Sequence, residues 1–103
     1  MSVKDTLKAI AEPRRRQILT LVRDRELSAG DIAARFDISR PAISQHLGVL
    51  REAGLVSERR LGTRRLYRVR PEGLAELREF LDGFWDGRLD ALRRKAELEE
   101  KRR

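Results

Sequence analysis

The spacing of apolar residues changes twice along this chain of 103 residues, and those changes restrict the folds that it can adopt. Up to Leu55 the apolar side chains recur every three or four positions, which is the period of an amphipathic helix. Two extended runs follow, Val56–Leu61 and Arg64–Val69, and the helical period returns from Pro71 onward. A chain of this length forms one domain. The sequence therefore predicts helices, then one hairpin, then helix, around a single core.

Four short helices are predicted before the hairpin, and capping residues mark their boundaries. Pro13 suits the first turn of the second helix, where its missing N–H would be unpaired anyway. Ser28 is the predicted N-cap of the third helix, with Asp31 as its capping-box partner, and Ser39 is the predicted N-cap of the fourth. Gly54 stands where a left-handed residue would end that helix. The apolar residues at helical spacing are Val3, Leu7, Ile10, Ile18, Leu21, Val22, Ile32, Ala33, Phe36, Ile43, Leu47 and Leu50.

The hairpin and the last third of the chain have equally clear patterns. Gly62-Thr63 predicts a type II′ turn, because glycine occupies the first of the two loop positions. Tyr67 and Val69 are expected to face the core, and Leu27 is expected to be a single extended residue. Pro71 opens one long helical segment. Its apolar residues are Leu74, Leu77, Leu81, Phe84, Trp85, Leu89, Leu92 and Ala96.

This order of elements predicts a winged helix-turn-helix, because two short helices joined by a tight turn are followed by a basic hairpin. The fold class is mainly α with a small β-hairpin, with about five helices and a two-stranded wing. The whole chain, residues 1–103, is expected to form this single domain.

The positive charge of the chain is confined to its first two-thirds. The formal net charge is +7, yet residues 1–70 hold 16 basic and 8 acidic residues, whereas residues 71–103 hold 8 and 9. This asymmetry favours a polyanionic partner. A coding bias toward arginine would explain why 20 of the 24 basic residues are Arg. It would not explain why the excess stops at residue 70.

The fourth helix has the composition of a helix that reads DNA bases. Its exposed face carries Pro41, Ser44, Gln45, Gly48 and Glu52, opposite the apolar residues. Arg40 stands at the N-terminal edge, where it could reach a phosphate or a guanine. Serine can donate or accept at a base edge, and glutamine can pair with adenine through two bonds. An ordinary solvated helix is the alternative, but such faces usually carry Glu and Lys. Residues 40–49 contain no acid and one base, which favours recognition of double-stranded DNA.

The hairpin carries six arginines against one acid, Glu58. Such a ribbon is expected to repel itself unless a phosphate backbone supplies the counter-charge. A solvated surface ribbon is the alternative. Of the six, the first four are predicted to contact DNA. The six arginines are Arg59, Arg60, Arg64, Arg65, Arg68 and Arg70.

Two other basic features leave alternatives open. His46 flanks the apolar side of the fourth helix, and either contact with a phosphate or a bond within the core would account for it. It is included among the predicted DNA-binding residues. The run Arg14, Arg15, Arg16 is interpreted as a solvated face rather than as a direct contact.

Taken together, four segments and the order of the elements resemble the ArsR family of bacterial winged-helix repressors. The segments are residues 10–19 (IAEPRRRQIL), 39–47 (SRPAISQHL), 49–56 (VLREAGLV) and 62–67 (GTRRLY). The resemblance implies repression of a promoter, often the protein's own. It also implies that Ser44 and Gln45 contact bases. A further likeness, at Phe84-Trp85 and the residues after it, is to a subgroup with a long last helix.

The resemblance further implies a homodimer formed by the first and last helices, residues 1–11 and 71–100. The stripe on the last helix is too apolar for one small domain to cover, which supports the same conclusion. The predicted interface residues are Val3, Leu7, Leu77, Leu81, Phe84, Trp85, Leu89 and Leu92.

Metal-sensing members of that family carry a Cys-x-Cys element in the third helix, and this chain does not. Ser28 and Gly30 occupy those positions, and the chain contains no cysteine and one histidine. Asp82, Asp86 and Asp90 recur every four residues but lack the nitrogen or sulfur donors that zinc prefers. They are interpreted as a solvated face. The chain is therefore expected to bind no metal and no cofactor, and a small-molecule effector is left open.

Several other function classes are disfavoured. No phosphate-binding glycine loop or nucleophile–histidine–carboxylate set argues for an enzyme. A protein-interaction module would not need six arginines on its hairpin, and an architectural DNA binder would prefer Arg or apolar wedges to Ser and Gln. No apolar run approaches the ~18 residues of a membrane span, and the N-terminus lacks a secretory core. A cytoplasmic bacterial or archaeal protein, associated with the nucleoid when bound, is expected.

Overall fold

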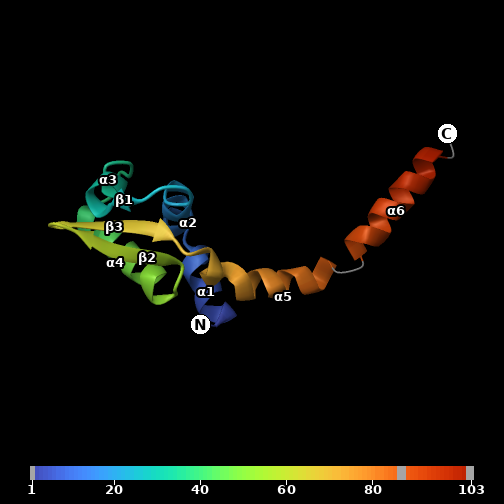
Figure 1. Cartoon of the computed structure of the whole chain (residues 1–103), viewed down its shortest axis with the longest axis horizontal. Coiled ribbons are helices and arrows are strands. Elements are labelled where there is room, and N and C mark those ends of the chain that lie inside the picture. The colour runs from blue at the N-terminus through green and yellow to red at the C-terminus, as the bar shows by residue number, and fades with distance from the viewer. Residues whose placement is uncertain (1, 86–87, 102–103) are drawn as a thin grey trace.

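The computed structural model describes residues 2–85 and 88–101, with side chains for 2–85 and 91–100. Six α-helices, a 3-10 turn and three strands follow one another in the described residues (Figure 1), where about five helices were predicted. The elements are α1 (Val3–Ala11), α2 (Pro13–Leu21), β1 (Leu27–Ser28), α3 (Ala29–Ala33), α4 (Arg40–Glu52), β2 (Val56–Leu61), β3 (Arg64–Val69), η1 (Pro71–Leu74), α5 (Ala75–Trp85) and α6 (Arg88–Lys101).

Side chains cap the short helices at their N-termini. The Ser28 hydroxyl accepts a hydrogen bond from the Asp31 N–H at 3.1 Å, and the Ser39 hydroxyl accepts from the Ala42 N–H at 3.2 Å, as predicted. The predicted capping box is only half formed, because the Asp31 carboxylate accepts a hydrogen bond from Arg64. Each cap satisfies a backbone donor that the helix itself leaves unpaired.

Glu12 caps α2, a role that the sequence patterns did not reveal. Its carboxylate accepts from the backbone N–H groups of Arg14 and Arg15 at 2.7 and 3.2 Å. Burial alone would raise the pKa of Glu12, but these hydrogen bonds and the nearby positive charge outweigh it and hold the pKa below its ordinary value. The cap is therefore strongest at neutral pH and is lost as pH falls through the folded-state pKa.

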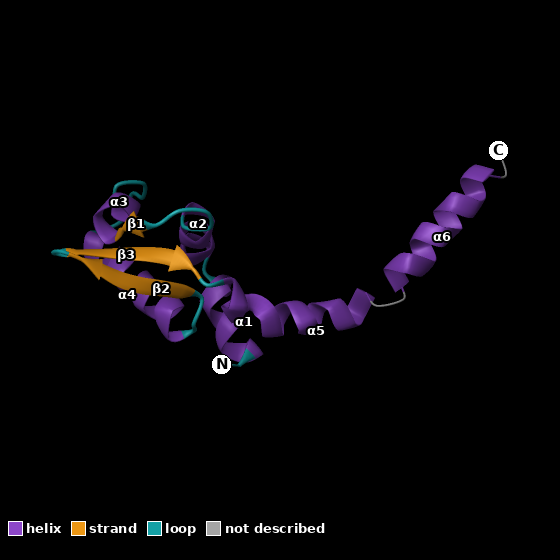
Figure 2. Ribbon diagram, in the orientation of Figure 1, coloured by secondary structure: helices purple, strands orange, loops and turns teal. Residues whose placement is uncertain are grey.

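The strands form a three-stranded antiparallel sheet in the order β1-β3-β2 (Figure 2). In the β2–β3 hairpin, Val56 pairs with Val69 and Leu61 pairs with Arg64. Gly62 has φ 63°, whereas Thr63 does not have a positive φ. A positive φ at the first loop position alone agrees with the predicted type II′ turn. Leu27 was predicted to be a lone extended residue; instead β1 adds a third strand to the hairpin through backbone pairing with β3.

The core lies between the helices of the N-terminal half and the base of the sheet. Tyr67 is buried in it and Val69 packs against it, as predicted. The largest fully buried side chains are Ile18, Ile32, Ile43, Leu47, Leu50, Leu55, Val22 and Val56.

The chain leaves the sheet through a close contact between two glycines. Gly54 ends α4 with φ 74°, the predicted left-handed conformation. Gly73 lies against its backbone: a Cβ added at Gly73 would overlap the Gly54 carbonyl oxygen and lie 2.9 Å from its carbonyl carbon. This close contact between Gly54 and Gly73 positions the start of the C-terminal helices against the end of α4.

We expect Gly73→Ala to destabilise the fold by about 1–3 kcal/mol, the usual cost of overpacking. Gly48→Ala is the matched control, because an added Cβ at Gly48 meets no atom within 4 Å. Within a helix that change should stabilise by about 1 kcal/mol. Urea unfolding of both variants measures the difference. Similar stability changes in both would contradict the close contact.

The C-terminal segment departs from the single helix predicted from Pro71. Its first turn is the 3-10 turn η1, with Gly73 held against Gly54, and α5 begins only at Ala75. Two helices, α5 and α6, then follow (Figure 1). The prediction that concerns Asp86 falls outside the described residues. No helix in the described part of the chain is both long and apolar enough to cross a membrane.

Candidate nucleic-acid interface

The amphipathic division predicted for α4 is present in the structure. Ile43, Leu47 and Leu50 are buried, whereas Ser44 and Gln45 are exposed on the other side. Pro41 lies in the first turn, which Ser39 caps. The rigid start of the helix therefore presents a short, uncharged polar surface to the outside.

The polar face of α4 forms one wall of an open groove of about 550 Å³. The hairpin forms the facing wall, and the start of α3 closes one end. Arg40 extends over this end, since a Cβ added at Gly30 would lie 3.7 Å from its Nη2 atom. The lining residues are Ser28, Ala29, Gly30, Arg40, Ser44, Gly48, Arg51, Glu58, Thr63, Arg64, Arg65 and Tyr67.

Four of the six hairpin arginines have a carboxylate partner within the protein, so phosphate is not the only counter-charge available to them. Arg59 donates two hydrogen bonds to Glu26, from Nε at 2.7 Å and from Nη2 at 2.9 Å. Arg64 donates to Asp31 at 3.1 Å. Each carboxylate precedes its arginine by 33 residues in the sequence. The pairing of β1 with β3 brings them beside it.

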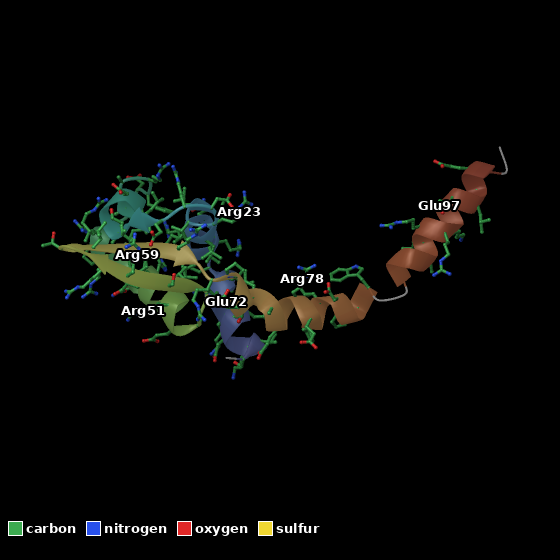
Figure 3. All side chains as sticks on the ribbon, in the orientation of Figure 1. Arg23, Arg51, Arg59, Glu72, Arg78 and Glu97 are labelled. Atoms are coloured by element: carbon green, nitrogen blue, oxygen red, sulfur yellow. The ribbon has the colours of Figure 1, made fainter. Side chains whose placement is uncertain are left out.

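Glu58 joins the two walls of the groove. Its carboxylate accepts from Arg51 of α4 at 2.9 Å and from the Tyr67 hydroxyl at 3.0 Å, and Arg65 lies 3.8 Å away. Burial and the bond to Glu58 raise the pKa of the Tyr67 hydroxyl, so it remains a donor. Figure 3 shows Arg51 on α4 and Arg59 on the hairpin.

Arg60 and Arg68 differ from the other hairpin arginines. Neither forms an ion pair with any residue whose side chain the structure describes. Arg60 stands directly across the hairpin from Arg65. Like charges at such a position repel each other, so this end of the hairpin keeps an excess of positive charge.

His46 is held by a side chain of α2. Its Nδ1 atom lies 3.3 Å from Nη1 of Arg15, which corresponds to the interpretation in which His46 bonds within the protein. Arg15 also donates to the carbonyl oxygens of Ala9 at 2.6 Å and Lys8 at 3.1 Å.

Of the run predicted to be a solvated face, Arg14 and Arg16 are exposed, whereas Arg15 is half-buried against the end of α1. Arg16 donates to the carbonyl oxygens of Ile10 and Ala11 at 2.7 and 3.0 Å. Together Arg15 and Arg16 bind carbonyl groups at the end of α1, which a helix leaves unpaired.

Most of the predicted interface residues are exposed in the single chain. Leu7, Leu81, Phe84, Trp85 and Leu92 are exposed, Val3 is half-buried, and Leu77 is buried within the chain itself. The side chain of Leu89 lies outside the described ones.

Phe80 belongs to the same exposed surface, and the sequence patterns missed it. Its ring meets that of Phe84 edge to face, with centroids 5.2 Å apart, and half of the residue is exposed. Its position four residues before Phe84 was the available signal, because residues four apart lie on one face of a helix.

Of the three aspartates spaced four residues apart, the structure describes the side chain of Asp82 alone. Asp82 pairs with Arg78 at 3.7 Å, and Asp86 and the Asp90 side chain lie outside the described part. Among the residues that the structure describes, no group of three or more His, Cys, Asp or Glu is placed to hold a metal ion.

Comparisons with known proteins agree with this architecture. The family model described as "Bacterial regulatory protein, arsR family" matches residues 12–58. The HTH-type transcriptional regulator Rv2034 of Mycobacterium tuberculosis is 48% identical over 77 residues, covering 75% of this chain and 72% of that protein. The transcriptional repressor SdpR of Bacillus subtilis is 45% identical over 60 residues, covering 58% and 67%.

A solved structure matches almost end to end. The protein described as a possible transcriptional regulator for arsenical resistance superposes with a TM-score of 0.72 at 48% identity, covering 88% of this chain and 95% of that one. The match extends beyond α4 and the hairpin to most of the fold. The chain therefore belongs to the arsR family of bacterial regulatory proteins, whose members are winged helix-turn-helix transcription regulators and not enzymes.

Proposed function

We propose that this chain is a repressor that binds double-stranded DNA as a homodimer. Its binding sites are inverted-repeat operators, one of which lies in its own promoter. The observation that carries the proposal is the groove between α4 and the hairpin, which four arginines line together with small polar side chains. A relative, SdpR, is named a transcriptional repressor. The four arginines are Arg40, Arg51, Arg64 and Arg65.

In this proposal, α4 enters the major groove and reads bases. Ser44 and Gln45 are exposed on its polar face, and both side chains can bond to base edges. Gly48 keeps that face thin, since the space beside it is open. Arg40 stands at the N-terminal edge of α4, where it reaches a phosphate or a guanine.

The hairpin holds the phosphate backbone. Arg64 and Arg65 line the groove, and Arg60 stands across the strand from Arg65. We leave Arg59 out of the proposed contacts. Arg59 does not line the groove, and it is bonded twice to Glu26.

Two copies are needed because one recognition helix reads few base pairs. The exposed apolar residues of α1 and α5 are the proposed contact between copies, and α1 and α5 pack together in the single chain. A dimer would present its two recognition helices ~34–36 Å apart, one turn of the duplex. No metal ion is proposed to control binding, because the chain offers no thiolate and one imidazole.

The test separates base recognition by α4 from phosphate binding by the hairpin. A footprint of the protein's own promoter first identifies the operator. Ser44→Ala with Gln45→Ala should then lose about 1–3 kcal/mol for each lost base contact at the operator, with little change on random duplex. Titration of both duplexes in parallel measures the ratio of affinities.

Arg60→Gln with Arg65→Gln is the matched control. It removes two phosphate contacts and should weaken operator and random duplex alike. If both double variants reduced the operator preference equally, the proposed division between α4 and the hairpin would be wrong. If the wild type left its promoter unprotected and bound every duplex equally, the repressor proposal itself would fail.

A further inference from the structure

We propose that Asp31 competes with DNA phosphate for Arg64, and so sets how tightly the wing holds any duplex. The inference rests on the proposed function and assigns a second role to a residue predicted only to cap α3. Asp31 is the positioning residue, and Arg64 is the side chain through which it acts.

Arg64 lies at the groove, and its pair with Asp31 is open to exchange. One hydrogen bond of 3.1 Å joins Arg64 Nη2 to Asp31 Oδ2. Both side chains are more than half exposed, 57% for Arg64 and 55% for Asp31. Arg64 lines the groove directly, beside the first residues of α3. A phosphate entering the groove can therefore reach the guanidinium without unpacking the core.

A carboxylate and a phosphate bind a guanidinium in the same way, through oxygen atoms that accept its N–H groups. When DNA binds, Arg64 must exchange the Asp31 carboxylate for a phosphate. Breaking the ion pair lowers the net free energy gained from the phosphate contact. An exposed ion pair contributes about 0.2–1 kcal/mol. The cost is therefore small for each protomer but is incurred twice in a dimer.

The Glu26–Arg59 pair provides a comparison within the same sheet. It also joins a hairpin arginine to an acid 33 residues earlier, but through two hydrogen bonds. Arg59 pairs in register with Leu66, which in turn pairs with Ser28, so the ion pair spans the central strand β3. Glu26 and Arg59 do not line the groove. This pair holds the sheet together and should not compete with DNA.

The experiment compares Asp31→Asn with Glu26→Gln, each of which removes one carboxylate from a wing arginine. Both are titrated with a random-sequence duplex and with the footprinted operator at constant salt. Asp31→Asn should tighten binding to both duplexes about two- to thirtyfold for a dimer, leaving their ratio unchanged. Glu26→Gln should leave affinity within about twofold and should lower the thermal stability.

A second arm distinguishes competition for Arg64 from simple repulsion between Asp31 and DNA. In an Arg64→Gln background, Asp31→Asn should no longer tighten binding, because the contested side chain is gone. Circular dichroism of each variant confirms that it is folded.

Three results would overturn the inference: no tightening by Asp31→Asn, equal tightening by Glu26→Gln, or a gain that persists without Arg64. A wild type that bound neither duplex would overturn the proposed function instead, so the two failures are distinguishable.

Discussion

The affinity of the proposed dimer for DNA should fall by about 10⁴-fold when salt is raised from about 50 to 200 mM. Four arginines of each protomer, Arg40, Arg60, Arg64 and Arg65, lie along the groove or beside it. A dimer would then neutralise about eight phosphates, and a slope near −0.9 per contact gives about −7 for log affinity against log salt.

Titrations of one duplex at a series of salt concentrations measure this slope. Arg60→Gln with Arg65→Gln removes about four contacts from a dimer and should make the slope shallower by about 3–4. A wild-type slope close to zero would show that the arginines of the groove do not bind phosphate.

Phe84→Glu should convert the proposed dimer into monomers and remove operator binding at concentrations where the wild type binds. Phe84 is 62% exposed in the single chain, beside the half-exposed Phe80 and Trp85. A buried phenylalanine contributes about 1.5–3 kcal/mol, and a symmetric interface loses two of them. The dimer dissociation constant should therefore rise by about 10²–10⁴-fold, before the cost of burying the new carboxylates.

Equilibrium sedimentation at micromolar concentration measures the assembly state. Leu61→Glu is the matched control, because Leu61 is 54% exposed but lies at the end of β2, away from α1 and α5. It should remain dimeric. A dimeric Phe84→Glu variant would show that the contact between copies lies elsewhere. A monomeric wild type would show that there is no such contact.

The helices and the hairpin could be predicted because their signals are local. The caps at Ser28 and Ser39, the left-handed Gly54 and the hairpin around Gly62 each depend on residues within a few positions. The buried face of α4 followed from its period in the same way. A local interaction has the same partners in any tertiary arrangement, so sequence spacing is sufficient to find it.

The start of the C-terminal segment could not be predicted in the same way. Its apolar spacing indicates a helix from Pro71, but a 3-10 turn comes first, where Gly73 meets Gly54. That contact joins segments that no periodicity connects. The caps provided by Arg15 and Arg16 were missed for a related reason, because long side chains can reach back past the break between α1 and α2.

The sequence by itself determined that the chain folds as helices with one basic hairpin, that α4 has a neutral polar face, and that the positive charge ends near residue 70. Only the tertiary structure decided which charges meet. Glu26 and Asp31 reach the hairpin because β1 pairs with β3, across 33 residues of chain. Charge attraction does not specify a partner by sequence distance, so these pairs depend on the packed fold. As a result Arg59 is bound across the sheet, whereas Arg64 lies at the groove.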